Sequence, residues 1–228
     1  MSKSFLVVGA SQGLGFALCK RLHEDGNTVL GISRTAPKVA CTEYVQWTHE
    51  LLDVSNLEET RNWVSLRSET HPDETFDGVV FCHAKHGDKG GSQWNSDLWE
   101  EYFRVNCTSI VSMYSSLDSH GKLNDPCNTV LLGSFLQNGS ANQPAYASSK
   151  SALWAWMRSY TMDQSSSDTK AVNMLWPARV DTPSNPFRDL SEKDPNFFRL
   201  PEEVSDEVVH LLDNVLGRRG TTVDVGRS

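Results

Sequence analysis

Short apolar segments alternate with longer segments of helical periodicity along this chain. The short segments are apolar throughout, rich in β-branched residues and bounded by Gly, Asn, Asp or Pro, which is typical of buried strands. They are Phe5–Val8, Thr28–Ile32, Val79–Cys82, Thr129–Leu132 and Ala171–Trp176, and the ambiguous Tyr44–Leu51 segment fits a further strand. The longer segments predict helices over Leu14–Glu24, Leu57–Arg67, Leu98–Leu117, Ala145–Met162 and Glu202–Leu216.

This alternation of strands and helices predicts the fold class. Each strand-helix-strand unit implies a right-handed crossover between parallel strands, and continuously apolar strands are buried on both faces. We therefore expect an α/β fold, a doubly wound parallel sheet with helices on both faces, in a single domain over residues 1–228. Ligands of such sheets bind beyond the carboxyl ends of the strands, so polar motifs at those ends carry the functional argument.

Composition argues against several classes of partner. Among 228 residues, Lys and Arg number 21 and Asp and Glu number 29, and the net charge of −8 disfavours nucleic acid and anionic membranes. No apolar run approaches the roughly 20 residues of a membrane-spanning helix, and no signal-peptide pattern is present. We therefore expect a soluble cytoplasmic protein. The five cysteines lack CxxC spacing and predict reduced thiols rather than disulfides or a metal site.

A glycine-rich segment joins the first predicted strand to the first predicted helix. Its sequence is Gly9-Ala10-Ser11-Gln12-Gly13-Leu14-Gly15. Glycines at such a junction allow a tight turn and a close approach of the main chain to a pyrophosphate, whose charge is met by free N–H groups and the helix dipole. The segment predicts dinucleotide binding by Gly9, Ser11, Gln12, Gly13, Leu14 and Gly15. The alternative is a plain turn, for which one glycine would suffice.

The end of the second predicted strand bears on which dinucleotide binds. NAD-binding sheets usually place an Asp or Glu there to hold the ribose 2′-hydroxyl, whereas this chain has Ser33-Arg34. A guanidinium can grip a 2′-phosphate through two hydrogen bonds, so NADP(H) is favoured over NAD(H), although an exposed arginine can also be simply solvated. Asp53 and Val54 are candidates to contact the adenine. The alternative is that Asp53 and Ser55 only start the following helix.

Tyr146 and Lys150 are the main candidates for acid-base chemistry. Their spacing of four residues in a predicted helix places both side chains on one face, one turn apart. An ammonium group beside a phenol favours the phenolate, so we expect Lys150 to lower the pKa of Tyr146 toward working pH. Such a pair also occurs on solvated helices. Here, however, Ser134 follows a predicted strand at the sheet edge where a ligand binds.

Together these motifs resemble those of the short-chain dehydrogenase/reductase family. The resemblance runs nearly from end to end, through Gly9–Gly15, Asp53-Val54, Cys82-His83-Ala84, Val105-Asn106, Gly133-Ser134, Tyr146–Lys150, Trp176–Thr182 and a last strand within Gly220–Gly226. It implies a Rossmann fold and a catalytic tetrad of Asn106, Ser134, Tyr146 and Lys150.

The resemblance also implies a role for each site residue. Tyr146 would be the general acid in carbonyl reduction and the general base in alcohol oxidation, and Ser134 would donate a hydrogen bond to the substrate oxygen. Lys150 would hold the hydroxyls of the nicotinamide ribose, and Asn106 would hold a water that links Lys150 to solvent. Further cofactor contacts are implied for Tyr146, Lys150, His83 and Ala84 and, around the nicotinamide carboxamide, for Pro177, Val180 and Thr182.

The chain departs from the family pattern after the Val79–Cys82 strand. Where the family usually has Asn-Asn-Ala-Gly, this chain has Cys82-His83-Ala84-Lys85, so that His83 replaces a structural asparagine and Lys85 a glycine. We expect His83 to hydrogen-bond to the main chain rather than to take part in catalysis.

Residues 182–201 form a long predicted loop with several prolines and phenylalanines. Loops of this length in compact domains are often functional. We therefore expect a substrate-covering loop within the catalytic domain, against the alternative of an ordinary packed surface loop.

The sequence thus predicts an NADP(H)-dependent oxidoreductase, of the ketoreductase type, that interconverts a small-molecule carbonyl and an alcohol. The alternative is a non-catalytic dinucleotide-sensing or signalling protein on the same scaffold, but the tetrad positions are intact. The resemblance further implies a homodimer or homotetramer, because Trp154, Trp156 and Met157 lie on a helix that family members use for subunit contacts. Alternatively, these three residues belong to the monomer core.

Overall fold

The computed structural model describes residues 2–37, 47–87, 95–163, 169–177, 179–182, 199–213 and 220–225. The strands are β1 (Ser4–Val8), β2 (Thr28–Ser33), β3 (Trp47–Leu51), β4 (Phe76–Phe81), β5 (Leu123–Leu132), β6 (Lys170–Pro177) and β7 (Thr222–Val225). The helices are α1 (Gly13–Glu24), α2 (Leu57–Thr70), α3 (Ser96–Phe103), α4 (Ser109–Ser119), α5 (Pro144–Asp163) and α6 (Pro201–Asp213). A π-helical turn η2 (Arg104–Thr108) joins α3 to α4, and a 3-10 helix η3 (Phe135–Asn138) follows β5.

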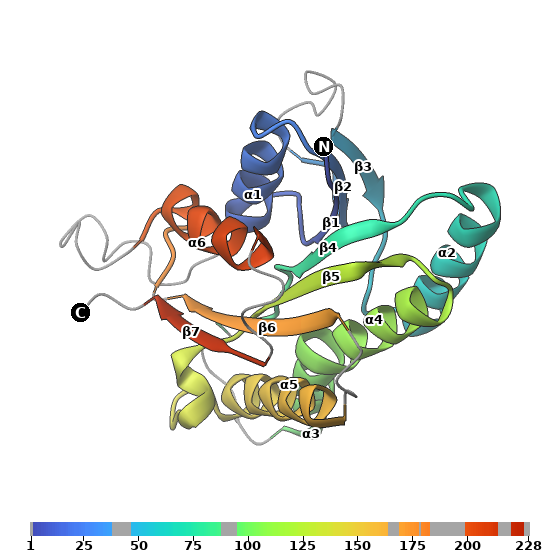
Figure 1. Cartoon of the computed structure of the whole chain (residues 1–228). Coiled ribbons are helices and arrows are strands. Elements are labelled where there is room, and N and C mark those ends of the chain that lie inside the picture. Colours follow the sequence, from blue (N-terminus) through green and yellow to red (C-terminus); the bar gives the residue numbers. More distant parts are fainter. Residues whose placement is uncertain are drawn as a thin grey trace.

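Within these ranges the strands form one parallel sheet in the order β3-β2-β1-β4-β5-β6-β7 (Figure 1). β1 lies between β2 and β4, and its Phe5 is in register with Val29 on one side and Gly78 on the other. The strand order reverses between β1 and β4. In doubly wound sheets a ligand binds above this reversal, beyond the carboxyl ends of the strands.

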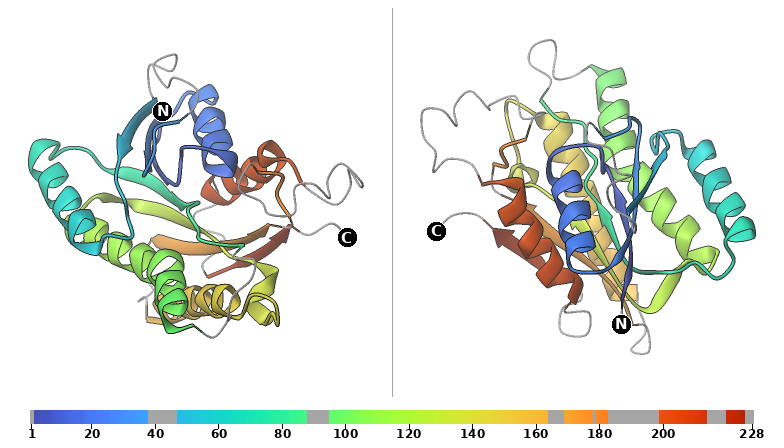
Figure 2. Two further views of the ribbon diagram at one scale, coloured as in Figure 1. Left: turned by 180° about the vertical axis from the view of Figure 1, so that it is seen from behind. Right: turned by 90° about the horizontal axis from the view of Figure 1, so that it is seen from above.

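Helices cover both faces of the sheet, as Figures 1 and 2 show. Along β1, Phe5 and Val7 pack with apolar residues of α1 and α6, whereas Leu6 and Val8 pack with those of α2, α4 and α5. This alternation is the period of two that a strand imposes on its side chains. Because both faces are covered, β1 is buried along Phe5–Val8, and the predicted doubly wound α/β fold is confirmed.

Most predicted elements agree with the structure, with two differences among the described residues. The predicted helix Leu98–Leu117 is interrupted, because η2 separates α3 from α4. β5 begins earlier than the predicted Thr129. Asn124, Asp125 and Pro126 interrupt the apolar pattern in its first half, so this half was not predicted as a strand. Residues 44–46 of a predicted strand and 214–216 of a predicted helix lie outside the described residues.

The tryptophans of α5 divide between core and surface. Met157 is fully buried and Trp156 packs against the core, so both serve the monomer core. Trp154 remains 37% exposed. Among the described helices, none has the length and hydropathy that a membrane span requires.

Candidate active site

The glycine-rich segment links the ends of β1, β2 and β4. The N–H groups of Gly9 and Ala10 both donate to the carbonyl oxygen of Ile32, at 2.7 and 3.1 Å. Gly9 has a φ of +93°, and a Cβ there would lie 2.6 Å from the main-chain nitrogen of His83. Only glycine meets both requirements, because an L side chain would be strained and would collide with the backbone after β4.

The amino end of α1 suits an anionic ligand. Its N-cap, Gln12, makes no side-chain capping hydrogen bond, and no acidic residue lies in the first turn. At α2, by contrast, the side chain of Asn56 accepts a hydrogen bond from Glu59 N–H at 3.3 Å. The first N–H groups of α1 therefore have no side-chain cap, and they fit the pyrophosphate predicted at Gly9–Gly15. Of the predicted contacts, Leu14 is buried in the core, Ser11 is half-buried and Gln12 is exposed.

At the end of β2, Ser33 is buried and hydrogen-bonded, whereas Arg34 is exposed. The Ser33 hydroxyl donates to the Thr35 carbonyl oxygen at 2.7 Å and lies 2.8 Å from Nε2 of His49. It thus holds the turn that carries Arg34. The Arg34 side chain is exposed, as a ligand-binding guanidinium at this position must be. Burial lowers the pKa of His49, a neighbour that the sequence did not reveal.

Asp53 forms a turn with Ser55 before the following helix, as the alternative interpretation of these two residues predicted. Its Oδ1 accepts hydrogen bonds from the main-chain N–H of Ser55 at 3.0 Å and from the Ser55 hydroxyl at 2.7 Å. This turn precedes α2, whose cap is Asn56. Val54 is buried in the core. Contact of Asp53 and Val54 with an adenine remains a prediction.

Ser134, Tyr146 and Lys150 lie close together where β5 ends. The Ser134 side chain lies close enough to the Tyr146 phenol to lower its pKa. Lys150 Nζ lies 6.0 Å from the centroid of the Tyr146 ring and donates to the carbonyl oxygen of Leu132 at 2.7 Å. The predicted tyrosine-lysine pair on one helix face therefore exists beside the predicted serine.

Burial is the largest influence on the pKa values of Tyr146 and Lys150. It raises the pKa of Tyr146, while the Ser134 side chain acts in the opposite direction. Burial also lowers the pKa of Lys150 to about 8, opposed by the neighbouring Cys107 and Cys82. The expectation of a lowered pKa for Tyr146 is therefore wrong for the chain by itself, because burial of the phenol is the largest influence on this pKa and raises it.

Asn106 holds the site together from within η2. Its side chain is fully buried, and Oδ1 accepts from Lys85 N–H at 2.7 Å. Its Nδ2 donates to the Lys85 carbonyl oxygen at 3.0 Å and to the Ser149 hydroxyl at 3.0 Å. Ser149 in turn donates to the carbonyl oxygen of Tyr146 at 2.8 Å. The Asn106 amide thus fastens the segment after β4 to α5, and the predicted bridging water remains a prediction.

Comparison with known proteins identifies the family. The family model described as short chain dehydrogenase matches residues 3–193. The chain belongs to the short-chain dehydrogenase family. A benzil reductase ((S)-benzoin forming) from Bacillus subtilis is 24% identical over 201 residues, covering 83% of this chain and 80% of that protein.

Solved structures of this family share the fold. A short chain dehydrogenase from Salmonella enterica serovar Typhi has a TM-score of 0.85 at 23% identity, covering 100% of this chain and 97% of its own. A variant of actinorhodin polyketide ketoreductase, solved with NADPH, has a TM-score of 0.82 at 18% identity, covering 98% and 95%. Short-chain dehydrogenases use a nicotinamide cofactor, and their substrates are small carbonyl or alcohol compounds.

His83 stands where the family usually has an asparagine, and its side chain makes a hydrogen bond to the start of α4. Its Nε2 lies 3.0 Å from the hydroxyl of Ser109, which donates its own hydrogen to the Val105 carbonyl oxygen at 2.8 Å. Ser109 therefore accepts from Nε2–H, which assigns the neutral tautomer. Burial, aided by the charge of Lys150, lowers the pKa of His83 to about 3. A ring that stays neutral in this way is poorly suited to acid-base catalysis near neutral pH.

The segment after β6 returns to the glycine loop. A Cβ at Gly13, whose φ is +57°, would lie 3.0 Å from the Thr182 methyl carbon, so Thr182 packs on the dinucleotide loop. Val180 forms a parallel bridge with Arg199, which joins the two ends of the predicted covering loop. Pro177 ends β6, and Ala84 is exposed after β4. Residues 183–198 of that loop lie outside the described residues.

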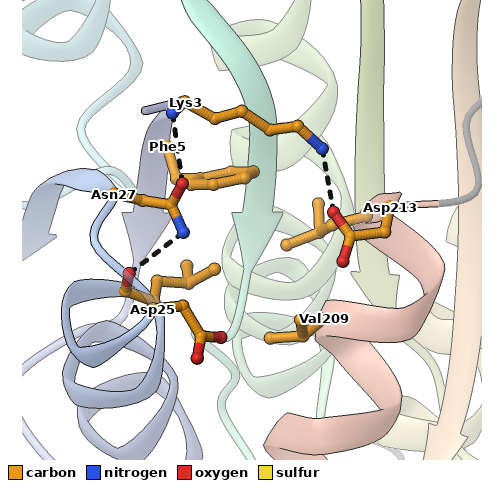
Figure 3. Close-up of a pocket in the computed structure, with 8 residues that line it drawn as sticks. Lys3, Phe5, Asp25, Asn27, Val209 and Asp213 are labelled. Atoms are coloured by element: carbon orange, nitrogen blue, oxygen red, sulfur yellow. Dashed lines mark hydrogen bonds and ion pairs between the residues drawn. The ribbon is translucent and has the colours of Figure 1, made fainter. Parts of the chain in front are cut away.

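A hollow of about 260 Å³ lies at the opposite end of the sheet (Figure 3). It lies beside the start of β1, where Lys3 Nζ pairs with Asp213 at 2.8 Å. Its lining residues are Lys3, Phe5, Leu22, Asp25, Asn27, Val209, Leu212 and Asp213. None of the predicted site residues is among them. Within the described ranges, no cluster of His, Cys, Asp or Glu is arranged to hold a metal ion.

Proposed function

We propose that this short-chain dehydrogenase is an NADP(H)-dependent reductase that interconverts a carbonyl and an alcohol, with Tyr146 as general acid and base. One observation carries the proposal: the Ser134 side chain acts on the Tyr146 phenol and lowers its pKa, and Lys150 Nζ lies 6.0 Å from the centroid of the Tyr146 ring. This group lies where β5 ends, and ligands of a doubly wound sheet bind along that edge.

The cofactor supplies or accepts the hydride when it is bound, and the chain supplies orientation and proton transfer. In reduction the Tyr146 hydroxyl donates its proton to the carbonyl oxygen of the substrate, and in oxidation it takes the proton back. Ser134 donates a hydrogen bond to the same oxygen, where negative charge develops. Because burial raises the pKa of Tyr146, the phenol holds its proton at neutral pH, which is the form that reduction uses.

The dinucleotide site is built from residues that fit its parts. Gly9, Ser11, Gln12, Gly13, Leu14 and Gly15 would hold the pyrophosphate at the uncapped end of α1. Arg34 would bind a 2′-phosphate, and Asp53 and Val54 the adenine. Lys150 would hold the nicotinamide ribose, with Ala84 and His83 nearby and Pro177, Val180 and Thr182 around the carboxamide.

The preference for NADP(H) rests on the end of β2. Arg34 is exposed there, and the β2 end lacks the acidic residue that would repel a 2′-phosphate. The NADPH held by the structurally similar actinorhodin polyketide ketoreductase supports the same choice.

Self-association is a second part of the proposal. Trp154 on α5 is 37% exposed and Met162 is 80% exposed, which leaves apolar surface on this helix. We expect a homodimer or homotetramer that uses this surface, and sedimentation of the wild type against Trp154→Glu measures it.

Cofactor binding and turnover together test the proposal. Tryptophan fluorescence, with seven tryptophans as reporters, measures the binding of NADPH and of NADH. Loss of NADPH absorbance with benzil, the substrate class named for the Bacillus subtilis relative, measures turnover. NADPH binding and benzil reduction support the proposal. Binding without reduction of benzil or of other aromatic and aliphatic carbonyls would instead favour the dinucleotide-sensing alternative.

A further inference from the structure

Lys85 occupies the family's glycine position, and its main chain is fixed independently of its side chain. Asn106 accepts from the Lys85 N–H at 2.7 Å and donates to its carbonyl oxygen at 3.0 Å. These two bonds require only a backbone. A glycine would satisfy them equally, so the lysine side chain needs another explanation.

The Lys85 side chain folds against α3. Its Nζ lies 3.2 Å from Oε2 of Glu101 and 5.5 Å from the centroid of the Tyr102 ring. The Lys85 side chain is 24% exposed, so its contact with Tyr102 is partly shielded from water, which strengthens a cation–π interaction. Lys85 therefore holds Tyr102 from one side.

Tyr102 makes contact with Tyr146 on another side. The two rings meet edge to face, with centroids 6.3 Å apart and planes at 74°. Tyr102 is only 3% exposed, so its ring is confined by its neighbours. Edge-to-face pairs at this separation are attractive and directional. The position of the Tyr146 ring is thus coupled to the ring that Lys85 holds.

The main chain of Tyr146 is coupled to the same segment. Asn106 binds Lys85 and also the Ser149 hydroxyl at 3.0 Å, and Ser149 donates to the Tyr146 carbonyl oxygen at 2.8 Å. One route through Asn106 therefore fixes the backbone of Tyr146, and a second route through Tyr102 contacts its ring. The Lys85 side chain belongs to the second route, through its contact with Tyr102.

We propose that Lys85 and Tyr102 are positioning residues that hold the Tyr146 ring beside Ser134 and Lys150. Neither residue touches the reacting atoms. Lys85, clamped by Glu101, restrains Tyr102, and Tyr102 restrains the phenol that transfers the proton. The kinetic consequence rests on the proposed function, whereas the restraint on the ring does not.

Ring-labelled tyrosine NMR measures the restraint without any substrate. The chain has five tyrosines, and comparison with Tyr146→Phe assigns the Tyr146 signals. In Lys85→Met and in Tyr102→Leu we expect these signals to shift and broaden, and in Lys85→Arg to match the wild type. Lys3→Met is the matched control, because Lys3 is also a lysine paired with a carboxylate, at 2.8 Å from Asp213, but lies at the opposite end of the sheet.

Turnover of benzil with NADPH measures the consequence. We expect Lys85→Met to lower kcat about tenfold with unchanged affinity for NADPH, since a small misplacement of a reacting group costs this much or more. Lys85→Arg should restore kcat, and Lys85→Met combined with Tyr102→Leu should be no slower than Tyr102→Leu alone, because both changes interrupt one route.

The outcomes separate the two proposals. Displaced Tyr146 signals in Lys85→Met support the positioning role, even where the wild type reduces no carbonyl and the proposed function fails. Tyr146 signals identical to the wild type in both Lys85→Met and Tyr102→Leu overturn the positioning role, whatever the activity. A kcat that falls equally in Lys85→Met and Lys3→Met overturns it as well.

Discussion

The buried ammonium group of Lys150 donates a hydrogen bond of 2.7 Å to the carbonyl oxygen of Leu132. Leu132 is the last residue of β5, two residues before Ser134, so the bond ties α5 to the strand that positions the serine. The chain by itself therefore holds Lys150 within the site. The same bond satisfies a lysine that is only 1% exposed, where an unpaired ammonium group would be costly.

Tyr146→Phe tests the proton-transfer role. The variant keeps the ring and its edge contact with Tyr102 but lacks the hydroxyl that would transfer the proton. We expect turnover to fall about a hundredfold or more, which is the range for loss of a general acid, while NADPH binding stays unchanged. Benzil reduction and fluorescence titration measure the two effects. Unchanged turnover would contradict the mechanism.

The pH dependence should differ between the two directions. Reduction needs the protonated phenol, and burial raises the pKa of Tyr146, so reduction should persist from neutral into mildly alkaline solution. Oxidation needs the phenolate and should rise with pH over the same range. Initial rates of benzil reduction and of benzoin oxidation across a pH series check both signs. Reduction that declines as pH rises toward neutrality would show that the phenol has a lowered pKa.

Arg34→Ala tests cofactor choice. The guanidinium is exposed at the end of β2, where we propose that it binds a 2′-phosphate, a group that NADH lacks. We expect NADPH to bind about tenfold to a hundredfold more weakly, as for loss of a charged hydrogen bond, and NADH to bind as before. Arg61→Ala, which removes another exposed arginine, is the matched control. If Arg34→Ala weakened the binding of NADPH and of NADH equally, the basis for the NADP(H) assignment would be removed.

Features that depend on local spacing were predictable from the sequence. The turn at Gly9–Gly15 and the Tyr146–Lys150 pair each lie within one short segment, where backbone geometry alone sets the arrangement. The parallel sheet with helices on both faces followed from the alternation of apolar and helical segments. The fold class and the residues of the candidate site could therefore be named before the structure.

Features that join distant segments were not predictable. Ser33 meets His49 across 16 residues, and Asn106 meets Ser149 across 43. The π-helical turn that carries Asn106 leaves no mark on the hydrophobic pattern. The predicted direction of the Tyr146 pKa shift was wrong for a related reason. Spacing shows that Lys150 is near Tyr146, but it does not show how much burial raises the pKa of the phenol.

His83→Asn restores the family's residue and tests the cost of a buried histidine. In the unfolded chain, histidine binds a proton below a pKa of about 6.5. In the folded chain, burial and Lys150 keep His83 neutral until about pH 3. Between these values the unfolded state binds more protons, so the free energy of unfolding falls as pH falls. At about pH 5 this single group lowers it by about 2 kcal/mol relative to about pH 8.

The His83→Asn variant lacks this contribution because asparagine does not titrate. Urea unfolding at both pH values should therefore show a smaller acid-induced loss of stability in His83→Asn than in the wild type. His120→Asn, which removes an exposed histidine, controls for the general effect of losing an imidazole. Comparing two pH values within each variant cancels the loss of the Ser109 hydrogen bond, which is present at both. An identical acid-induced loss in His83→Asn and the wild type would mean that His83 is protonated in the folded state.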